Sequence, residues 1–124
     1  MNDSINELIK KIVAFRDARD WKQFHNPKDL AISISLEAAE LLEVFQWSGS
    51  NTGADDKKTE KIKEELADVL IYSLLLGNDL GLDISEIVCE KIDENDKKYP
   101  AEKAYGKADK YTAYASDADG GKHE

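Results

Sequence analysis

The spacing of apolar and polar residues along this chain predicts helices. Ser4 and Glu7 stand three residues apart in the order of a capping box, which is typical of the start of a helix. We therefore expect a first helix from about Ile5 to Ala18. Its apolar residues recur at the spacing of one helix face: Ile5, Leu8, Ile9, Ile12, Val13 and Phe15.

A second predicted helix is apolar on more than one side. It follows a polar connector, Arg19 to His25, and begins where Asn26 and Pro27 are typical of an N-cap and a first helical position. We expect it to end near Trp47 or Ser48. Because a helix that is apolar nearly all round is buried on several faces, we expect it to contact a neighbouring subunit as well as its own core. Its apolar residues are Leu30, Ile32, Ile34, Leu36, Leu41, Leu42, Val44 and Phe45.

Two further helices follow a loop at residues 49–58, which is rich in Gly, Ser, Asn and Asp. The third is expected from about Thr59 to just before Gly81, which would cap its C-terminus. The fourth begins after a second capping-box pattern, Asp83 with Glu86, and stops before Pro100.

Helices joined by short loops, with no alternating strand pattern, predict an all-α four-helix bundle. We assign residues 1–112 to this single domain. Beyond residue 100 aliphatic side chains disappear, and we expect residues 113–124 to form a flexible polar tail.

Composition excludes several classes of protein. With 124 residues and a net charge of −9, the chain should be repelled by nucleic acids and by anionic membrane surfaces. Its single cysteine, Cys89, excludes an internal disulfide and a Cys-x-x-Cys zinc site. The sequence has no signal-peptide pattern and no apolar run long enough to span a bilayer, so we predict a cytoplasmic protein.

Two pairs of acidic residues stand at helical spacing. Glu37 and Glu40 are three residues apart, as are Glu65 and Asp68, so each pair projects from one face of its helix. From Leu30 to Trp47 there is no Lys or Arg to neutralise the first pair. Because like charges at this spacing repel, a metal ion is a plausible missing partner.

Four carboxylates from two helices would make a hard site of oxygen ligands, which suits Mg²⁺, with Mn²⁺ as a possible substitute, and favours phosphate chemistry. The alternative is that these acids are simply solvated, and the nearby Lys61 and Lys63 strengthen that alternative for the second pair. A di-iron site is rejected, because no acid is followed by His at the Glu-x-x-His spacing.

The acidic pairs belong to a longer pattern that resembles the MazG-like all-α nucleoside triphosphate pyrophosphohydrolases, and within them the dCTP pyrophosphatase branch. The resemblance covers about residues 5 to 112. Five blocks carry it in order: Arg19 to His25, Glu40 to Trp47, Glu64 to Tyr72, Lys91 to Asn95, and Lys98 to Pro100.

This resemblance implies Mg²⁺-dependent hydrolysis of a (deoxy)nucleoside triphosphate to monophosphate and pyrophosphate, with dCTP-like substrates preferred, in the cleaning of nucleotide pools. It implies that Glu37, Glu40, Glu65 and Asp68 hold the metal. One carboxylate, with Glu37 and Glu40 as the candidates, would help deprotonate the attacking water. It also implies a homodimer or a homotetramer built as a dimer of dimers, with active sites shared between subunits.

The same resemblance assigns substrate-binding residues, each with a purely structural alternative. Trp21 and Trp47 would stack on the base, or pack in the core. The other candidates are His25, Tyr72, Lys91, Asn95 and Tyr99, which could equally be capping, core or surface residues. In the tail, Lys107, Lys110 and Tyr111 could close over the triphosphate.

One departure from the branch concerns the base. The first helix of dCTP pyrophosphatases carries a His that falls on Ile12 here, so a broader pyrimidine or deoxynucleotide range is plausible. Two rival interpretations remain: a non-catalytic helical module that presents its acidic face to a basic partner, and a related phosphohydrolase acting on dUTP or phosphoribosyl-ATP.

Overall fold

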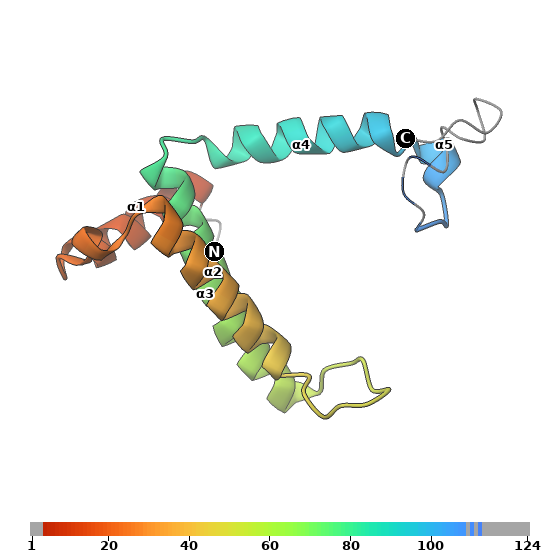
Figure 1. Ribbon diagram of the computed structural model, residues 1–124, viewed down its shortest axis with the longest axis horizontal. Coiled ribbons are helices and arrows are strands. Elements are labelled where there is room, and N and C mark those ends of the chain that lie inside the picture. The colour runs from red at the N-terminus through yellow and green to blue at the C-terminus, as the bar shows by residue number, and fades with distance from the viewer. Residues whose placement is uncertain (1–3, 109, 111, 113–124) are drawn as a thin grey trace. The chain divides into compact units, whose positions relative to one another are not determined.

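The computed structural model describes residues 4–108, 110 and 112, and this part of the chain forms helices and no strands (Figure 1). The predicted all-α class with four main helices is confirmed. The helices are α1 (Ile5–Asp17), the short 3₁₀ turn η1 (Trp21–Phe24), α2 (Pro27–Glu43), α3 (Asp56–Asp79), α4 (Ile84–Lys98) and the single turn α5 (Ala101–Ala104).

The chain divides into two compact units, residues 1–84 and 85–124. In the first unit, α2 and α3 form an antiparallel hairpin whose helices lie side by side, and α1 also packs on α3 (Figure 1). The apolar core of this unit is small: Leu30 on α2 and Leu75 on α3 are the buried aliphatic side chains among the described residues. The second unit contains α5 and nearly all of α4.

Side-chain caps fix where the first three main helices begin. The Ser4 hydroxyl accepts a hydrogen bond from the Glu7 backbone N–H at 3.2 Å, as the capping box predicts. Asn26 accepts from the Asp29 N–H at 2.9 Å and precedes Pro27, so this predicted start is also confirmed.

Two predicted helix limits near the hairpin loop were wrong. Helix α2 ends at Glu43 rather than at Trp47, because the backbone tightens into turns and reaches a positive φ of 68° at Trp47. Helix α3 begins at Asp56 rather than near Thr59. Its cap is Asp55, whose carboxylate accepts from the Lys58 N–H at 2.8 Å, so the end of the polar loop already belongs to the helix.

Gly81 ends the hairpin's second helix as predicted. Its φ of 68° lies in the left-handed region that glycine adopts without strain, and the Leu82 N–H returns to the Gly77 carbonyl at 2.9 Å. Gly77 itself lies against Ile84, where a Cβ atom would collide with the isoleucine side chain. A larger residue at position 77 would therefore force the Ile84 side chain to shift.

Within the first unit, helix α2 and helix α3 leave large apolar side chains exposed. Leu36 and Leu42 on α2 are 61% and 72% exposed, and Leu70 on α3 is 52% exposed. Such an amount of exposed aliphatic surface is typical of a face that another subunit covers. None of the described helices combines the length and the apolarity that crossing a bilayer requires.

Candidate metal and nucleotide site

The α2–α3 hairpin brings the two predicted acidic pairs together. One carboxylate oxygen from each of Glu37, Glu65 and Asp68 lies within 4.8 Å of the other two. Glu65 is buried, and Glu37 and Asp68 are half-buried. Since Glu37 comes from α2 and the other two from α3, the packing of the hairpin itself assembles this acidic cluster.

Two oxygens in the acidic cluster have no partner within the described structure. The Oε2 atoms of Glu37 and Glu65 are buried without a hydrogen bond. A buried carboxylate oxygen left unsatisfied is costly, and a cation that binds oxygen ligands would satisfy both atoms. The ligand set contains oxygen alone, which is the chemistry that Mg²⁺ and Mn²⁺ prefer. The residues present therefore fit a hard divalent cation.

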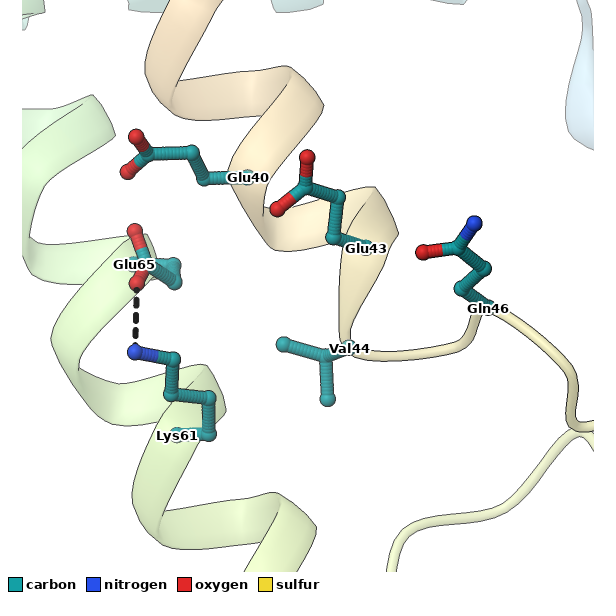
Figure 2. Close-up of a pocket in the computed structure, with 6 residues that line it drawn as sticks. All are labelled: Glu40, Glu43, Val44, Gln46, Lys61 and Glu65. Carbon is teal, nitrogen blue, oxygen red and sulfur yellow. Dashed lines mark ion pairs between the residues drawn. The ribbon is translucent and has the colours of Figure 1, made fainter.

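Glu40 adjoins the acidic cluster from α2. The nearby carboxyl groups of Glu37 and Glu65 raise the pKa of Glu40 to about 7, first through hydrogen bonding that favours its protonated form and then through repulsion of its charge. A raised pKa means that Glu40 takes up a proton more readily than an ordinary surface acid when no cation is present. In Figure 2 the carboxyl groups of Glu40 and Glu65 face each other from the two helices of the hairpin.

A hollow of about 490 Å³ opens beside Glu40 and Glu65 (Figure 2). Lys61 lies in its wall and places its Nζ 3.3 Å from Glu65 Oε1, and this contact raises the pKa of Lys61. Lys63 instead pairs with Glu60, at 2.9 Å. The alternative of a solvated second pair thus fails for Glu65, which is buried: Lys61 pairs with one of its oxygens and the other has no hydrogen-bond partner among the described residues.

An aromatic pocket of about 260 Å³ adjoins the acidic cluster. Trp21, His25 and Tyr72, three of the predicted substrate-binding residues, line it, and so does Asp68 of the acidic cluster. The rings of His25 and Tyr72 meet edge to face at 6.4 Å, and burial, followed by the charge of Glu37, raises the pKa of Tyr72. Asp68 therefore belongs to both halves of one continuous site.

Two further residues of the pocket come from α1. Ile12, the position where the resembling branch carries His, contributes an aliphatic side chain to the wall. Arg16, which the sequence analysis did not select, also lines the pocket and is only 5% exposed. Its position carries a sequence signal: it follows Ile12 by four residues, so a charged residue continues an apolar helix face.

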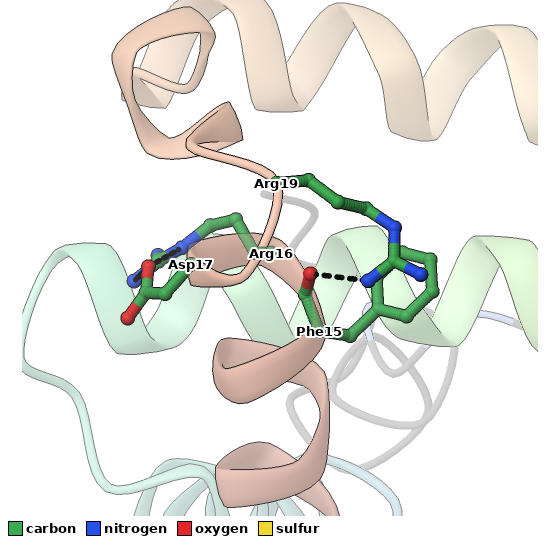
Figure 3. A network of polar contacts seen from close by, with 4 residues as sticks. All are labelled: Phe15, Arg16, Asp17 and Arg19. Atoms are coloured by element: carbon green, nitrogen blue, oxygen red, sulfur yellow. Dashed lines mark hydrogen bonds and ion pairs between the residues drawn. The ribbon is translucent and has the colours of Figure 1, made fainter.

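Polar contacts at the end of α1 hold this wall (Figure 3). The Nε and Nη2 atoms of Arg16 both lie 2.9 Å from Asp17 Oδ1. Arg19 takes a different direction: its guanidinium lies 3.7 Å from the centre of the Phe15 ring and donates to the Phe15 carbonyl at 2.9 Å. Phe15 in turn meets Trp21 edge to face at 5.8 Å.

The other predicted substrate-binding residues are not gathered around this pocket by the first unit. Trp47 is 91% exposed and lines neither of the two hollows. Lys91, Asn95 and Tyr99 belong to the second unit, where Lys91 pairs with Glu94 at 3.4 Å. Of the tail residues, Lys107 and Lys110 are exposed, whereas Tyr111 and the predicted tail at 113–124 lie outside the described residues.

The sequence is similar to several known proteins. It is 37% identical over 111 residues to dCTP pyrophosphatase 1 of Mus musculus and 37% identical to that of Homo sapiens, matches that cover 86% of this chain and 65% of each relative. The chain thus spans less than two thirds of the length of these curated relatives. A crystal structure of a pyrophosphatase from Archaeoglobus fulgidus DSM 4304 superimposes with a TM-score of 0.67 at 41% identity, covering 81% of this chain and 95% of that one.

The sequence profile of the MazG-like family matches residues 32–113. This range contains the whole acidic cluster and most of the helical chain. The predicted family is confirmed: the chain belongs to the MazG-like family.

Proposed function

We propose that the chain is a Mg²⁺-dependent hydrolase that cleaves (deoxy)nucleoside triphosphates to monophosphate and pyrophosphate, with dCTP-like substrates preferred. The observation that carries this proposal is the sharing of Asp68 between an oxygen-only acidic cluster and an aromatic pocket. The acids can hold a divalent cation, which in turn binds the triphosphate, and the aromatic side chains offer a surface for the base. The two halves of the site therefore match the two ends of a nucleotide. The names of the dCTP pyrophosphatase and pyrophosphatase relatives support the same reaction.

In this proposal Glu37, Glu40, Glu65 and Asp68 hold the metal. Bound Mg²⁺ would shield the triphosphate, assist the attacking water and neutralise the charge of the leaving pyrophosphate. Of these acids, Glu37 and Glu40 are our candidates for accepting the proton of the water. Because Glu65 is buried, its charge would attract a bound cation more strongly than a fully solvated carboxylate does.

The base would enter the aromatic pocket between Trp21, His25 and Tyr72. Trp21 offers an indole face for stacking, and the half-buried His25 offers a ring nitrogen. Lys91, Asn95, Tyr99 and Trp47 keep the substrate-binding roles that the resemblance implies, supplied by the same chain or by a neighbouring copy.

We also infer a homodimer or a homotetramer. The exposed apolar side chains of α2 and α3 support this, because the first unit by itself leaves them in water. A role in cleaning cytoplasmic nucleotide pools belongs to the same proposal.

Purified protein incubated with each deoxynucleoside triphosphate, with dUTP and with phosphoribosyl-ATP would test the reaction. We expect monophosphate and pyrophosphate in equal amounts, only with Mg²⁺ or Mn²⁺, and fastest with dCTP among the pyrimidines. Product separation by anion exchange measures both. Release of orthophosphate together with a diphosphate would overturn the assigned bond, and turnover confined to phosphoribosyl-ATP would overturn the substrate class.

A further inference from the structure

Arg16 is a buried cation in a pocket that is otherwise mainly aromatic and aliphatic. It is 5% exposed and lines the aromatic pocket together with Trp21 and His25. Buried arginine is rare unless its charge and its N–H groups are paired. The partners of this guanidinium therefore indicate what the pocket is built to hold.

Within the described structure, the guanidinium of Arg16 is paired with a single carboxylate, that of Asp17. A guanidinium has five N–H donors, and Asp17 Oδ1 engages two of its nitrogens, Nε and Nη2. The described residues provide no further hydrogen bond for Nη1. Asp17 itself is 53% exposed, so its charge is largely solvated. The remaining donors of Arg16 are available to an acceptor that enters the pocket.

His25, in the same pocket, carries a buried polar atom without a partner among the described residues. The Nδ1 atom of His25 is buried and has no hydrogen-bond partner in the described structure. A ring nitrogen can donate or accept, depending on its tautomer, whereas arginine can only donate. An arginine that the chain pairs from one side and a buried ring nitrogen without a partner share one pocket walled by Trp21 and Tyr72, which indicates a flat ligand with polar atoms on its edge.

We propose that Arg16 is a specificity-determining residue that donates a hydrogen bond to a carbonyl oxygen of the substrate's base, with His25 contacting the same edge. This inference rests on the proposed function, which places the base in the aromatic pocket. Asp17 positions the guanidinium from behind, as a carboxylate commonly does for a ligand-binding arginine.

The chemistry of the bases gives the inference its selectivity. Cytosine, uracil, thymine, guanine and hypoxanthine carry at least one carbonyl oxygen, and adenine carries none. A buried donor left unpaired by the wrong ligand is strongly unfavourable, which is how such a group discriminates. Adenine nucleotides should therefore be the poorest substrates of this chain.

The decisive substrates are dITP and dATP, whose bases differ in having a carbonyl or an amino group at carbon 6. We expect kcat/KM of the wild-type protein to be on the order of 10- to 100-fold higher for dITP, which is the range for a hydrogen bond to a charged group. In Arg16→Ala the ratio should fall to within about threefold of unity, through loss of dITP activity while dATP activity persists. Arg16→Lys, which keeps the charge but has one donor nitrogen in place of three, should give an intermediate ratio.

Lys10→Ala is the matched control, since it removes the same charge from an exposed position on α1. It should leave the ratio unchanged. A ratio near one in the wild type, or an unchanged ratio in Arg16→Ala, would overturn the role of Arg16 while leaving pyrophosphohydrolysis intact. If Arg16→Ala does not fold by circular dichroism, the wild-type ratio and Arg16→Lys decide. Failure of the proposed function looks different, because the wild type would then release no pyrophosphate from dCTP either.

Discussion

Glu40 and Glu94 are both exposed carboxylates on helices, yet their surroundings shift their pKa values in opposite directions. Hydrogen bonds and repulsion from Glu37 and Glu65 raise the pKa of Glu40 to about 7. Hydrogen bonds from Lys98 and Lys91 lower the pKa of Glu94. Exposure alone therefore does not separate a solvated surface acid from a site residue. The difference lies in the neighbours: α4 places lysines one turn away, whereas α2 and α3 place acids against acids (Figure 2).

The largest effect should come from removing a charge of the acidic cluster. We expect Glu40→Gln or Glu65→Gln to lower the rate of pyrophosphate release by at least about 100-fold, because even residues outside the direct ligands of a metal site are worth 10- to 100-fold. Steady-state kinetics at saturating Mg²⁺ measures the loss.

The matched control for this loss is Glu60→Gln on the same helix, an exposed glutamate that is paired with Lys63 at 2.9 Å. It should keep activity within about twofold. An exposed ion pair contributes little to stability, so its loss should leave the fold and the acidic cluster unchanged. Equal losses in Glu60→Gln and Glu65→Gln would mean that the acidic cluster has no special role.

The next effect concerns stability. Mg²⁺ that binds only the folded state should raise the melting temperature, by an amount that corresponds to about 2.7 kcal/mol at 100 times its dissociation constant. Differential scanning fluorimetry with Mg²⁺, with Mn²⁺ and with EDTA measures the shift, and Glu65→Gln should reduce it. A non-catalytic acidic module predicts the same melting temperature in all three conditions.

The smallest expected effect is a pH dependence of the protein without metal. The pKa of Glu40 rises from 4.5 to about 7 on folding, so between these values the folded chain keeps a proton that the unfolded chain has released. Stability from this group is complete below pH 4.5 and is lost as the pH rises through 7. The melting temperature in EDTA should therefore fall between pH 5 and pH 8.

Two comparisons separate this titration from other pH effects. Glu40→Gln should flatten the fall in melting temperature, and Mg²⁺ should remove it by compensating the charge. A melting temperature in EDTA that rises over the same pH range would contradict the raised pKa of Glu40.

Local signals let the sequence predict most helix starts and the acidic cluster. The caps at Ser4 and Asn26 depend on side chains three residues from their partners, and such short-range chemistry is visible in the sequence. The spacing of Glu65 and Asp68 likewise fixed their common face, although their meeting with Glu37 required the hairpin to form. The family resemblance supplied the substrate chemistry that spacing alone left open.

The errors and omissions have tertiary causes. The end of α2 was placed too late because its apolar pattern continues to Trp47, while the backbone turns away at Glu43. The sequence only weakly distinguishes Arg16 from a surface residue, because a basic side chain near a helix C-terminus is usually there to interact favourably with the helix dipole. Only the packing of α1 on α3 shows that this side chain is buried beside Trp21.

Helix α3 carries residues of both the acidic cluster and the aromatic pocket, so the number of residues between them is constrained. Glu65 and Tyr72 are seven residues apart, which is about 10 Å along a helix axis, and Asp68 lies between them. Inserting or deleting one residue between Asp68 and Tyr72 would rotate one end of the site by about 100° relative to the other. The distance between the phosphate end and the base end of the site is therefore set by the pitch of α3. Between Asp68 and Tyr72, a substitution keeps this distance, whereas an insertion or deletion does not.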